Sequence, residues 1–134
     1  MIAQLETYSP NYMHVLIQDA LKPIEPKSEG QKADEILKVV CDFYMITPEK
    51  IRERIRRRHI VLSRQVLMYM LKKYTKMSYK MIGEYCSDPE RYIYFDHTTA
   101  IYSLQTVEAL MSSDPIYKQD IETITKRINR LSLN

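Results

Sequence analysis

The sequence predicts an all-α fold, a helical bundle that contains a helix-turn-helix motif. Three observations lead to this prediction. Apolar residues recur at helical spacing in nearly every segment after residue 32. Cap residues followed directly by proline, Thr47-Pro48 and Asp114-Pro115, mark helix starts. The chain has only 2 glycines in 134 residues, which disfavours turn-rich all-β folds and glycine-built phosphate loops.

Residues 1–31 are predicted to form a short helix and a proline-containing linker. Ser9 and Pro10 fit an N-cap and a first-turn position, and the segment NYMHVLIQDAL continues as a short amphipathic helix. The stretch KPIEPKSEGQ, with two prolines and a glycine, then ends any helix. One folded domain is therefore expected over residues 32–134.

This domain begins with two predicted helices and a basic stretch. The first helix carries an apolar stripe, formed by Ile36, Leu37, Val40, Cys41 and Tyr44. Thr47 caps a short second helix that runs through about Ile55. The basic stretch RRRHIVL that follows has no clear period, so the next helix is expected to begin at Ser63.

The remaining helices also begin at cap residues, namely Ser63, Ser78, Asp96 and Asp114. Their predicted inward-facing residues are, in chain order, Val66, Leu67, Met70, Leu71 and Tyr74; Met81, Ile82 and Tyr85; Ile101, Leu104, Val107 and Met111; and Tyr117, Ile121, Ile124, Ile128 and Leu131. The helices opened by Ser78 and Asp96 flank an irregular connection, which is the layout of a helix-turn-helix. Gly83, inside the first of these two helices, predicts a close approach to its neighbours.

Positive charge is concentrated in one part of the chain. From Lys50 to Lys80 there are eleven Lys or Arg and one acid, Glu53, so the local charge is +10 within an overall charge of +3. The centre of this cluster is mostly arginine, which binds phosphate with paired hydrogen bonds. The asymmetry predicts a surface for a polyanion such as nucleic acid, with a solvated basic face as the alternative.

Several functional classes are disfavoured by motifs that the sequence lacks. It has no GxxxxGK[ST] or GxGxxG motif, no metal-ligand spacing around its histidines and cysteines, and no nucleophile beside Asp96-His97. We therefore expect no catalytic activity, no cofactor and no metal. Cys41 and Cys86 suit reduced core thiols, and no apolar run or signal pattern points to a membrane. A cytoplasmic protein without a membrane partner is predicted.

The segment DHTTAIYS opens the second helix of the predicted helix-turn-helix. Asp96 suits an N-cap, and the threonines suit hydrogen bonds within the first turn, which is a purely structural interpretation. The same side chains at a helix N-terminus also suit contacts with base edges and phosphates. The two interpretations are compatible because a capping side chain can also contact DNA.

The basic loop ending in Arg64-Gln65, the helix around Gly83 and the DHTT segment together resemble the C-terminal DNA-binding domain (domain IV) of the bacterial replication initiator DnaA. The resemblance covers Ala33 to Leu131. It implies sequence-specific binding of double-stranded DNA at DnaA-box-like sites, in replication initiation or its regulation. It also implies which residues contact the DNA.

By this matching, Asp96, His97 and Thr98 contact bases in the major groove, and Arg56, with Arg58 beside it, contacts bases in the adjacent minor groove. The residues matched to phosphate contacts, which set the register of the protein on DNA, are Arg57, Arg64, Gln65, Lys72, Lys80 and Thr99.

The sequence departs from the family pattern between the two helices. A short Gly-Gly-Arg turn is usual there, whereas this chain has the longer SDPERYIYF, so we expect an enlarged turn that either touches DNA or obstructs it. Its apolar residues 92–95 either fold back onto the bundle, which we favour, or are covered by a partner.

With no ATPase module in the sequence, a stand-alone domain is expected. The alternative function is a protein-interaction module, in which residues 87–95 or the N-terminal helix bind a replication protein or mediate self-association.

Overall fold

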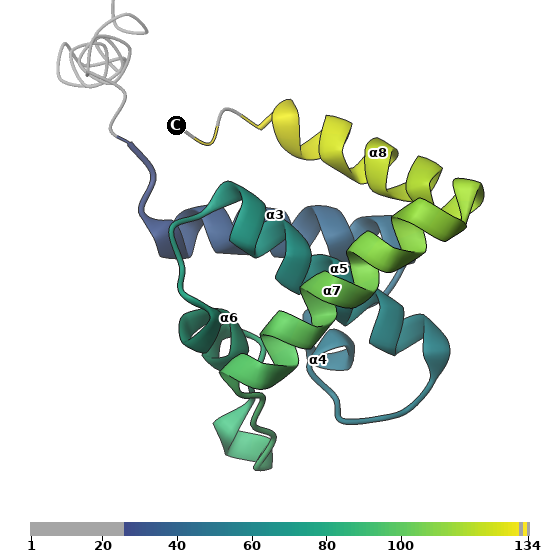
Figure 1. Ribbon diagram of the computed structural model, residues 1–134. Coiled ribbons are helices and arrows are strands. Elements are labelled where there is room, and N and C mark those ends of the chain that lie inside the picture. Colours follow the sequence, from purple (N-terminus) through teal and green to yellow (C-terminus); the bar gives the residue numbers. More distant parts are fainter. Residues whose placement is uncertain (1–25, 132, 134) are drawn as a thin grey trace, which may run out of the picture.

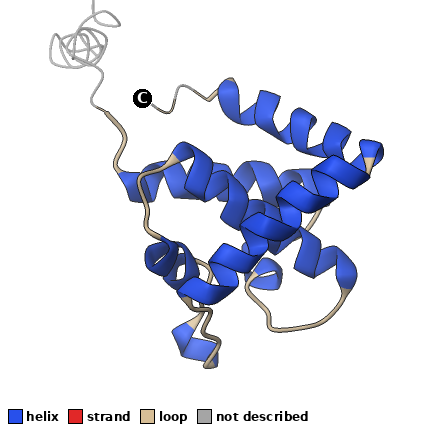
Figure 2. Ribbon diagram, in the orientation of Figure 1, coloured by secondary structure: helices blue, strands red, loops and turns tan. Residues whose placement is uncertain are grey.

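The computed structural model describes residues 26–131 and 133. Within them the chain forms helices and no strand, as Figure 2 shows, so the predicted all-α fold is confirmed. The elements are α3 (Glu29–Tyr44), α4 (Pro48–Ile51), α5 (Arg58–Tyr74), α6 (Tyr79–Tyr85), the short 3-10 helix η1 (Pro89–Arg91), α7 (His97–Ser113) and α8 (Pro115–Asn129). Helix α5 is central and packs against α3, α4, α6 and α7, while α8 packs on α3 and α7 (Figure 1).

Helix α3 begins inside the segment assigned above to the linker. The Ser28 hydroxyl accepts a hydrogen bond from Gln31 N at 3.1 Å, and the Gln31 side chain accepts one from Ser28 N at 2.8 Å. This reciprocal capping box stabilises the first turn and outweighs the helix-weakening effect of Gly30. The helix therefore starts at Glu29, ahead of the predicted limit at residue 32. The helix predicted after Pro10 lies outside the described residues.

The basic region folds differently from the prediction. Helix α4 ends at Ile51 rather than near Ile55, and α5 begins at Arg58 rather than at Ser63. Ser63 is not a cap, because it is buried inside α5, where its hydroxyl donates to Ile60 O at 2.7 Å. The helical period was hidden in the sequence because two buried positions of α5 are polar, Ser63 and Arg64. Residues 52–57 are left as a short loop.

The core is formed by most of the predicted apolar stripes. Fully buried members include Ile36, Val40, Val66, Leu67, Met70, Leu71, Ile82, Ile121, Ile124 and Ile128. Two stripes differ from the prediction. Met81 is 49% exposed, and α7 buries the small residues Ala100 and Ser103 together with Val107, whereas Ile101, Leu104 and Met111 are only half-buried. Small residues on its buried face let α7 lie close to α5 and α6.

The connection between α6 and α7 is short in space although it is long in sequence. The predicted close approach of Gly83 is observed, because a Cβ atom on Gly83 would lie 2.6 Å from the Phe95 carbonyl oxygen. The Ser87 hydroxyl joins the two ends of the connection, donating to Gly83 O at 2.7 Å and accepting from Phe95 N at 2.8 Å. Between these ends, Asp88 and Ile93 form an isolated antiparallel bridge around η1. The enlarged turn is thus an ordered element.

The apolar residues of this turn fold back only in part. Phe95 is buried in the core and Ile93 is half-buried, but Tyr92 is 84% exposed and Tyr94 is 57% exposed.

The two cysteines are free and buried, and burial raises the pKa of the Cys41 thiol to about 11 and that of Cys86 to about 12. In the described part of the chain, no helix combines the length and apolarity needed to cross a bilayer.

Candidate nucleic-acid interface

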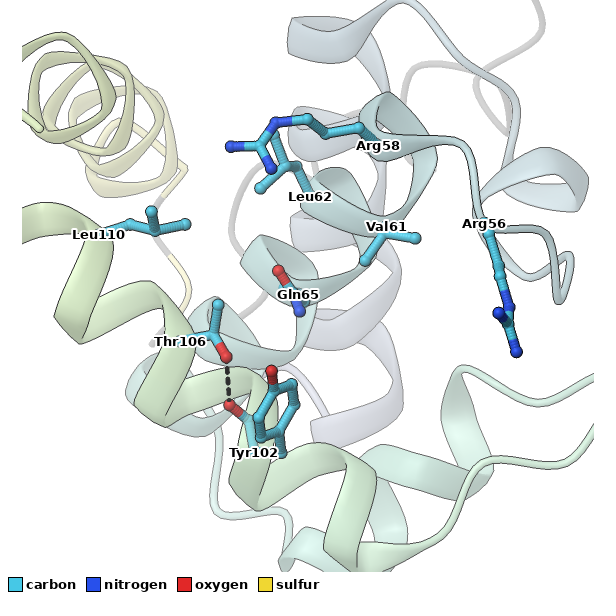
Figure 3. Close-up of a pocket in the computed structure, with 8 residues that line it drawn as sticks. All are labelled: Arg56, Arg58, Val61, Leu62, Gln65, Tyr102, Thr106 and Leu110. Atoms are coloured by element: carbon cyan, nitrogen blue, oxygen red, sulfur yellow. Dashed lines mark hydrogen bonds between the residues drawn. The ribbon is translucent and has the colours of Figure 1, made fainter.

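A cleft of about 360 Å³ lies between the start of α5 and the middle of α7. Figure 3 shows Arg56 and Arg58 on the α5 side and Tyr102, Thr106 and Leu110 on the α7 side. The full lining consists of Arg56, Arg58, Val61, Leu62, Gln65, Tyr102, Thr106 and Leu110. The basic loop and the helix opened by Asp96 therefore face the same side of the bundle, as a two-point contact with one duplex requires.

The amino end of α5 lacks the acidic and capping residues that helix N-termini usually carry. Arg57 is the N-cap and makes no side-chain capping hydrogen bond, Arg58 is the first helical residue, and the first turn contains no acid. Positive charge there is unfavourable because the helix dipole is also positive at its N-terminus. Arg56, Arg57 and Arg58 are exposed, and none of them forms a salt bridge with another described residue. A helix start of this kind suits an external anion such as phosphate.

The first turn of α7 combines capping with exposure. Asp96 Oδ1 accepts hydrogen bonds from Thr99 N at 3.0 Å and from Thr99 Oγ1 at 3.2 Å. The backbone hydrogen bond from Thr99 is the main cause that holds the pKa of Asp96 below its usual value, so the carboxylate stays charged. Its second oxygen can accept from a base amino group. His97 and Thr98 are exposed beside it.

Thr99 takes part in this cap, in keeping with the structural interpretation of the DHTT segment. Its backbone N–H and its hydroxyl both donate to Asp96, and its side chain is half-buried. Since a threonine hydroxyl has a single proton, Thr99 cannot donate to a phosphate while this hydrogen bond persists. Its predicted phosphate contact therefore competes with the cap.

Arg64, another residue matched to a phosphate contact, is largely buried. The residue is 8% exposed, and its guanidinium donates to Ile51 O at 3.2 Å and to Glu53 O at 2.7 Å. The same guanidinium lies 4.5 Å from the centroid of the Phe95 ring, and burial lowers the pKa of Arg64. Arg64 thus joins the end of α4 and the residue before Asp96 to α5. These contacts indicate a positioning role, while the phosphate contact stays a prediction.

The other three residues matched to phosphate contacts lie in different surroundings. Gln65 is half-buried and lines the cleft. Lys72 lies 4.4 Å from the centroid of the Tyr79 ring and donates to Met77 O at 3.5 Å, so its charge sits at the amino end of α6. Lys80 is exposed on α6. The lining of the cleft includes Gln65 but neither lysine.

Two residues on the α7 side of the cleft are not among the predicted DNA contacts. Tyr102 is 62% exposed, and Thr106 lies one turn further along α7. The signal was present, because Tyr102 is four residues after Thr98 and side chains with this spacing share one face of a helix. The face that begins at Thr98 therefore continues through Tyr102 to Thr106, and α7 carries no lysine or arginine along it.

Known proteins of one family are similar to this chain. The family described as "Bacterial dnaA protein helix-turn-helix" matches residues 33–107, which extend from α3 to the third turn of α7. The chromosomal replication initiator protein DnaA of Flavobacterium psychrophilum is 33% identical over 96 residues, which cover 72% of this chain and 19% of that protein. The DnaA protein of Gloeobacter violaceus is 33% identical over 113 residues, which cover 82% of this chain and 24% of that protein.

The chain thus spans about a fifth to a quarter of the length of these curated relatives. The matched part is a helix-turn-helix, which is a DNA-binding fold and not a catalytic one. Its observed geometry is that of such a motif, because α6 closely approaches the start of α7 at Gly83 and Asp96 caps α7. This chain belongs to the bacterial DnaA helix-turn-helix family.

Proposed function

We propose that this chain binds double-stranded DNA sequence-specifically, at sites similar to the DnaA box, in replication initiation or its regulation. The observation that carries the proposal is the cleft shared by the basic loop and α7. A recognition helix in a major groove and an arginine in the adjacent minor groove contact the duplex on two sides of one strand. That strand would pass over the cleft.

Each part of the surface has a distinct role in this proposal. The exposed first turn of α7, with Asp96, His97 and Thr98, enters the major groove and contacts bases. Arg56, which Figure 3 shows pointing away from Arg58, enters the minor groove. Arg58 is the second candidate for base contacts beside Arg56. Arg57 and the amino end of α5 bind the phosphates of the strand between the grooves, together with Gln65.

The salt dependence of binding tests this proposal. If about five phosphates are neutralised, the logarithm of the affinity falls against the logarithm of salt concentration with a slope of roughly −4 to −5. Fluorescence anisotropy with a duplex selected from a random pool measures this slope. A flat response would instead favour the protein-interaction module, for which the exposed Tyr92 and Tyr94 are the supporting observation.

Thr98→Ala separates base contacts from backbone contacts. We expect it to weaken binding to the selected duplex by roughly 1–3 kcal/mol and to leave binding to unrelated duplexes nearly unchanged, because a threonine methyl packs on thymine. Arg57→Ala is the matched control, since it should weaken both kinds of duplex equally and lower the salt slope by about one. An equal loss on every duplex from Thr98→Ala would show that Thr98 does not contact bases.

A further inference from the structure

The enlarged turn between α6 and α7 presents an exposed tyrosine beside the base-contacting end of α7. Tyr94 lies two residues before Asp96 and is 57% exposed. From residue 94 to the N-cap the backbone belongs to no helix, and Asp96 itself is extended, with φ −103° and ψ −177°.

In this segment two exposed residues flank a buried one. Phe95 is buried, under the guanidinium of Arg64, and its two neighbours in sequence are exposed. Tyr94 is therefore an exposed residue two positions before Asp96, which meets DNA in the proposed function. Two residues span at most about 7 Å, which corresponds to roughly two base-pair steps along the axis of the duplex.

The segment is held in this position by hydrogen bonds at three successive residues. Ile93 exchanges two backbone hydrogen bonds with Asp88, at 2.8 and 2.9 Å. The Arg54 guanidinium donates to the Tyr94 carbonyl oxygen, and Phe95 N donates to the Ser87 hydroxyl at 2.8 Å. A contact made from such a segment loses little conformational entropy when it forms.

The turn is also tied to α4 through Arg91. The Arg91 guanidinium donates to Glu49 O at 2.8 Å and to Asp88 Oδ2 at 2.5 Å, and it lies 3.6 Å from a Glu53 carboxylate oxygen. In these contacts the positive charge of Arg91 is paired with oxygen atoms of the protein itself. They leave the uncharged phenol of Tyr94 as the group that faces outward next to Asp96.

We infer that Tyr94 is a further DNA-contacting residue, whose phenol O–H donates to a phosphate about one to two nucleotides outside the bases met by Asp96. The inference rests on the proposed function. It assigns the enlarged turn a purpose, which is to lengthen the footprint on DNA at the N-terminal side of α7. Because this contact is to the DNA backbone, it increases the affinity, helps to set the register of the protein on DNA, and carries no base preference.

A double-mutant cycle between Tyr94 and its phosphate tests the inference. The variants are Tyr94→Phe, which keeps the ring and removes only the hydroxyl, and Tyr92→Asn, a control on the same turn. Tyr92 is 84% exposed and has a φ of 58°, a conformation that asparagine tolerates. The probes are the selected duplex with long flanks and the same duplex ending at the last base contacted from Asp96.

On the long duplex, we expect Tyr94→Phe to bind about tenfold more weakly than wild type, since one hydrogen bond to an ion is lost. The salt slope should stay unchanged because tyrosine carries no charge. On the short duplex, wild type and Tyr94→Phe should bind equally, and Tyr92→Asn should match wild type on both.

Equal binding of wild type and Tyr94→Phe to the long duplex would overturn the inference while leaving the proposed function intact. A deficit of Tyr94→Phe that persists on the short duplex would overturn it as well. Failure of wild type to bind either duplex would refute the proposed function instead. Unchanged DNA affinity, together with altered self-association of both tyrosine variants in sedimentation, would make the turn a protein-binding surface and reject the DNA contact.

Discussion

Gly83→Ala is expected to destabilise the fold by about 3 kcal/mol, at the upper end of the usual effect of overpacking. A Cβ atom at this position would lie 2.6 Å from Phe95 O and 2.8 Å from Asp96 O. Both obstructing atoms belong to the backbone, so no side chain can rotate away. The intrinsic helix preference of alanine, worth roughly 1 kcal/mol, offsets only part of the clash. Urea denaturation followed by circular dichroism measures the change.

The second glycine of the chain provides a matched control. Gly30 is also helical, but a Cβ atom there would meet nothing closer than the Ser28 hydroxyl at 3.9 Å. Gly30→Ala should therefore stabilise the protein slightly, by up to about 1 kcal/mol. Because Gly83 touches the N-cap of α7, Gly83→Ala should also weaken DNA binding of the folded protein, whereas Gly30→Ala should not. Equal stabilisation by both substitutions would contradict the close approach of α6 to α7.

Arg64→Met is expected to destabilise the fold by roughly 2–4 kcal/mol, because each carbonyl oxygen left without its partner costs about 1–3 kcal/mol. The two acceptors are the carbonyl oxygens of Ile51 and Glu53. Methionine retains an apolar contact with Phe95, so the loss reports on the guanidinium. DNA affinity should fall too, since Arg64 positions the loop that carries Arg56, but the salt slope should stay that of wild type.

Arg64→Lys distinguishes this positioning role from a phosphate contact. Lysine keeps the charge but cannot reproduce two hydrogen bonds and stacking on an aromatic ring. If Arg64 acted on phosphate, Arg64→Lys would bind DNA nearly normally and Arg64→Met would lower the salt slope by about one. We expect instead that both variants lose stability in thermal denaturation. Arg57→Ala, at an exposed N-cap, should change the salt slope with little effect on stability.

Elements marked by side-chain caps were predictable because capping is a local interaction. Ser78, Asp96 and Asp114 each accept a backbone N–H within their own first turn, at the positions predicted. Helix α5 was misplaced because its N-cap, Arg57, makes no side-chain capping hydrogen bond. Its buried Ser63 and Arg64 also interrupt the apolar period. A helix start that suits an external anion does not carry the usual sequence signal.

The candidate site also has features that the sequence could predict and features that it could not. Arg56, Arg58 and Thr98 are exposed, and their DNA contacts, proposed from residue type and matching alone, stay predictions. The burial of Arg64 could not be predicted, because its partners Ile51 and Phe95 are distant in sequence and meet it only after α4 and the turn pack on α5. Likewise, the sequence could not show that Phe95 is buried while its neighbour Tyr94 is 57% exposed.

The sequence by itself determined the helical class, the close approach at Gly83, the basic segment and the capped first turn of α7. Each of these depends on residues that are close together in the chain. Only the tertiary structure decided which polar groups face solvent. Burying a guanidinium is favourable only where distant carbonyl oxygens and an aromatic ring surround it. The same packing of α5 against α7 brings the arginines and the face of α7 beginning at Thr98 to one cleft.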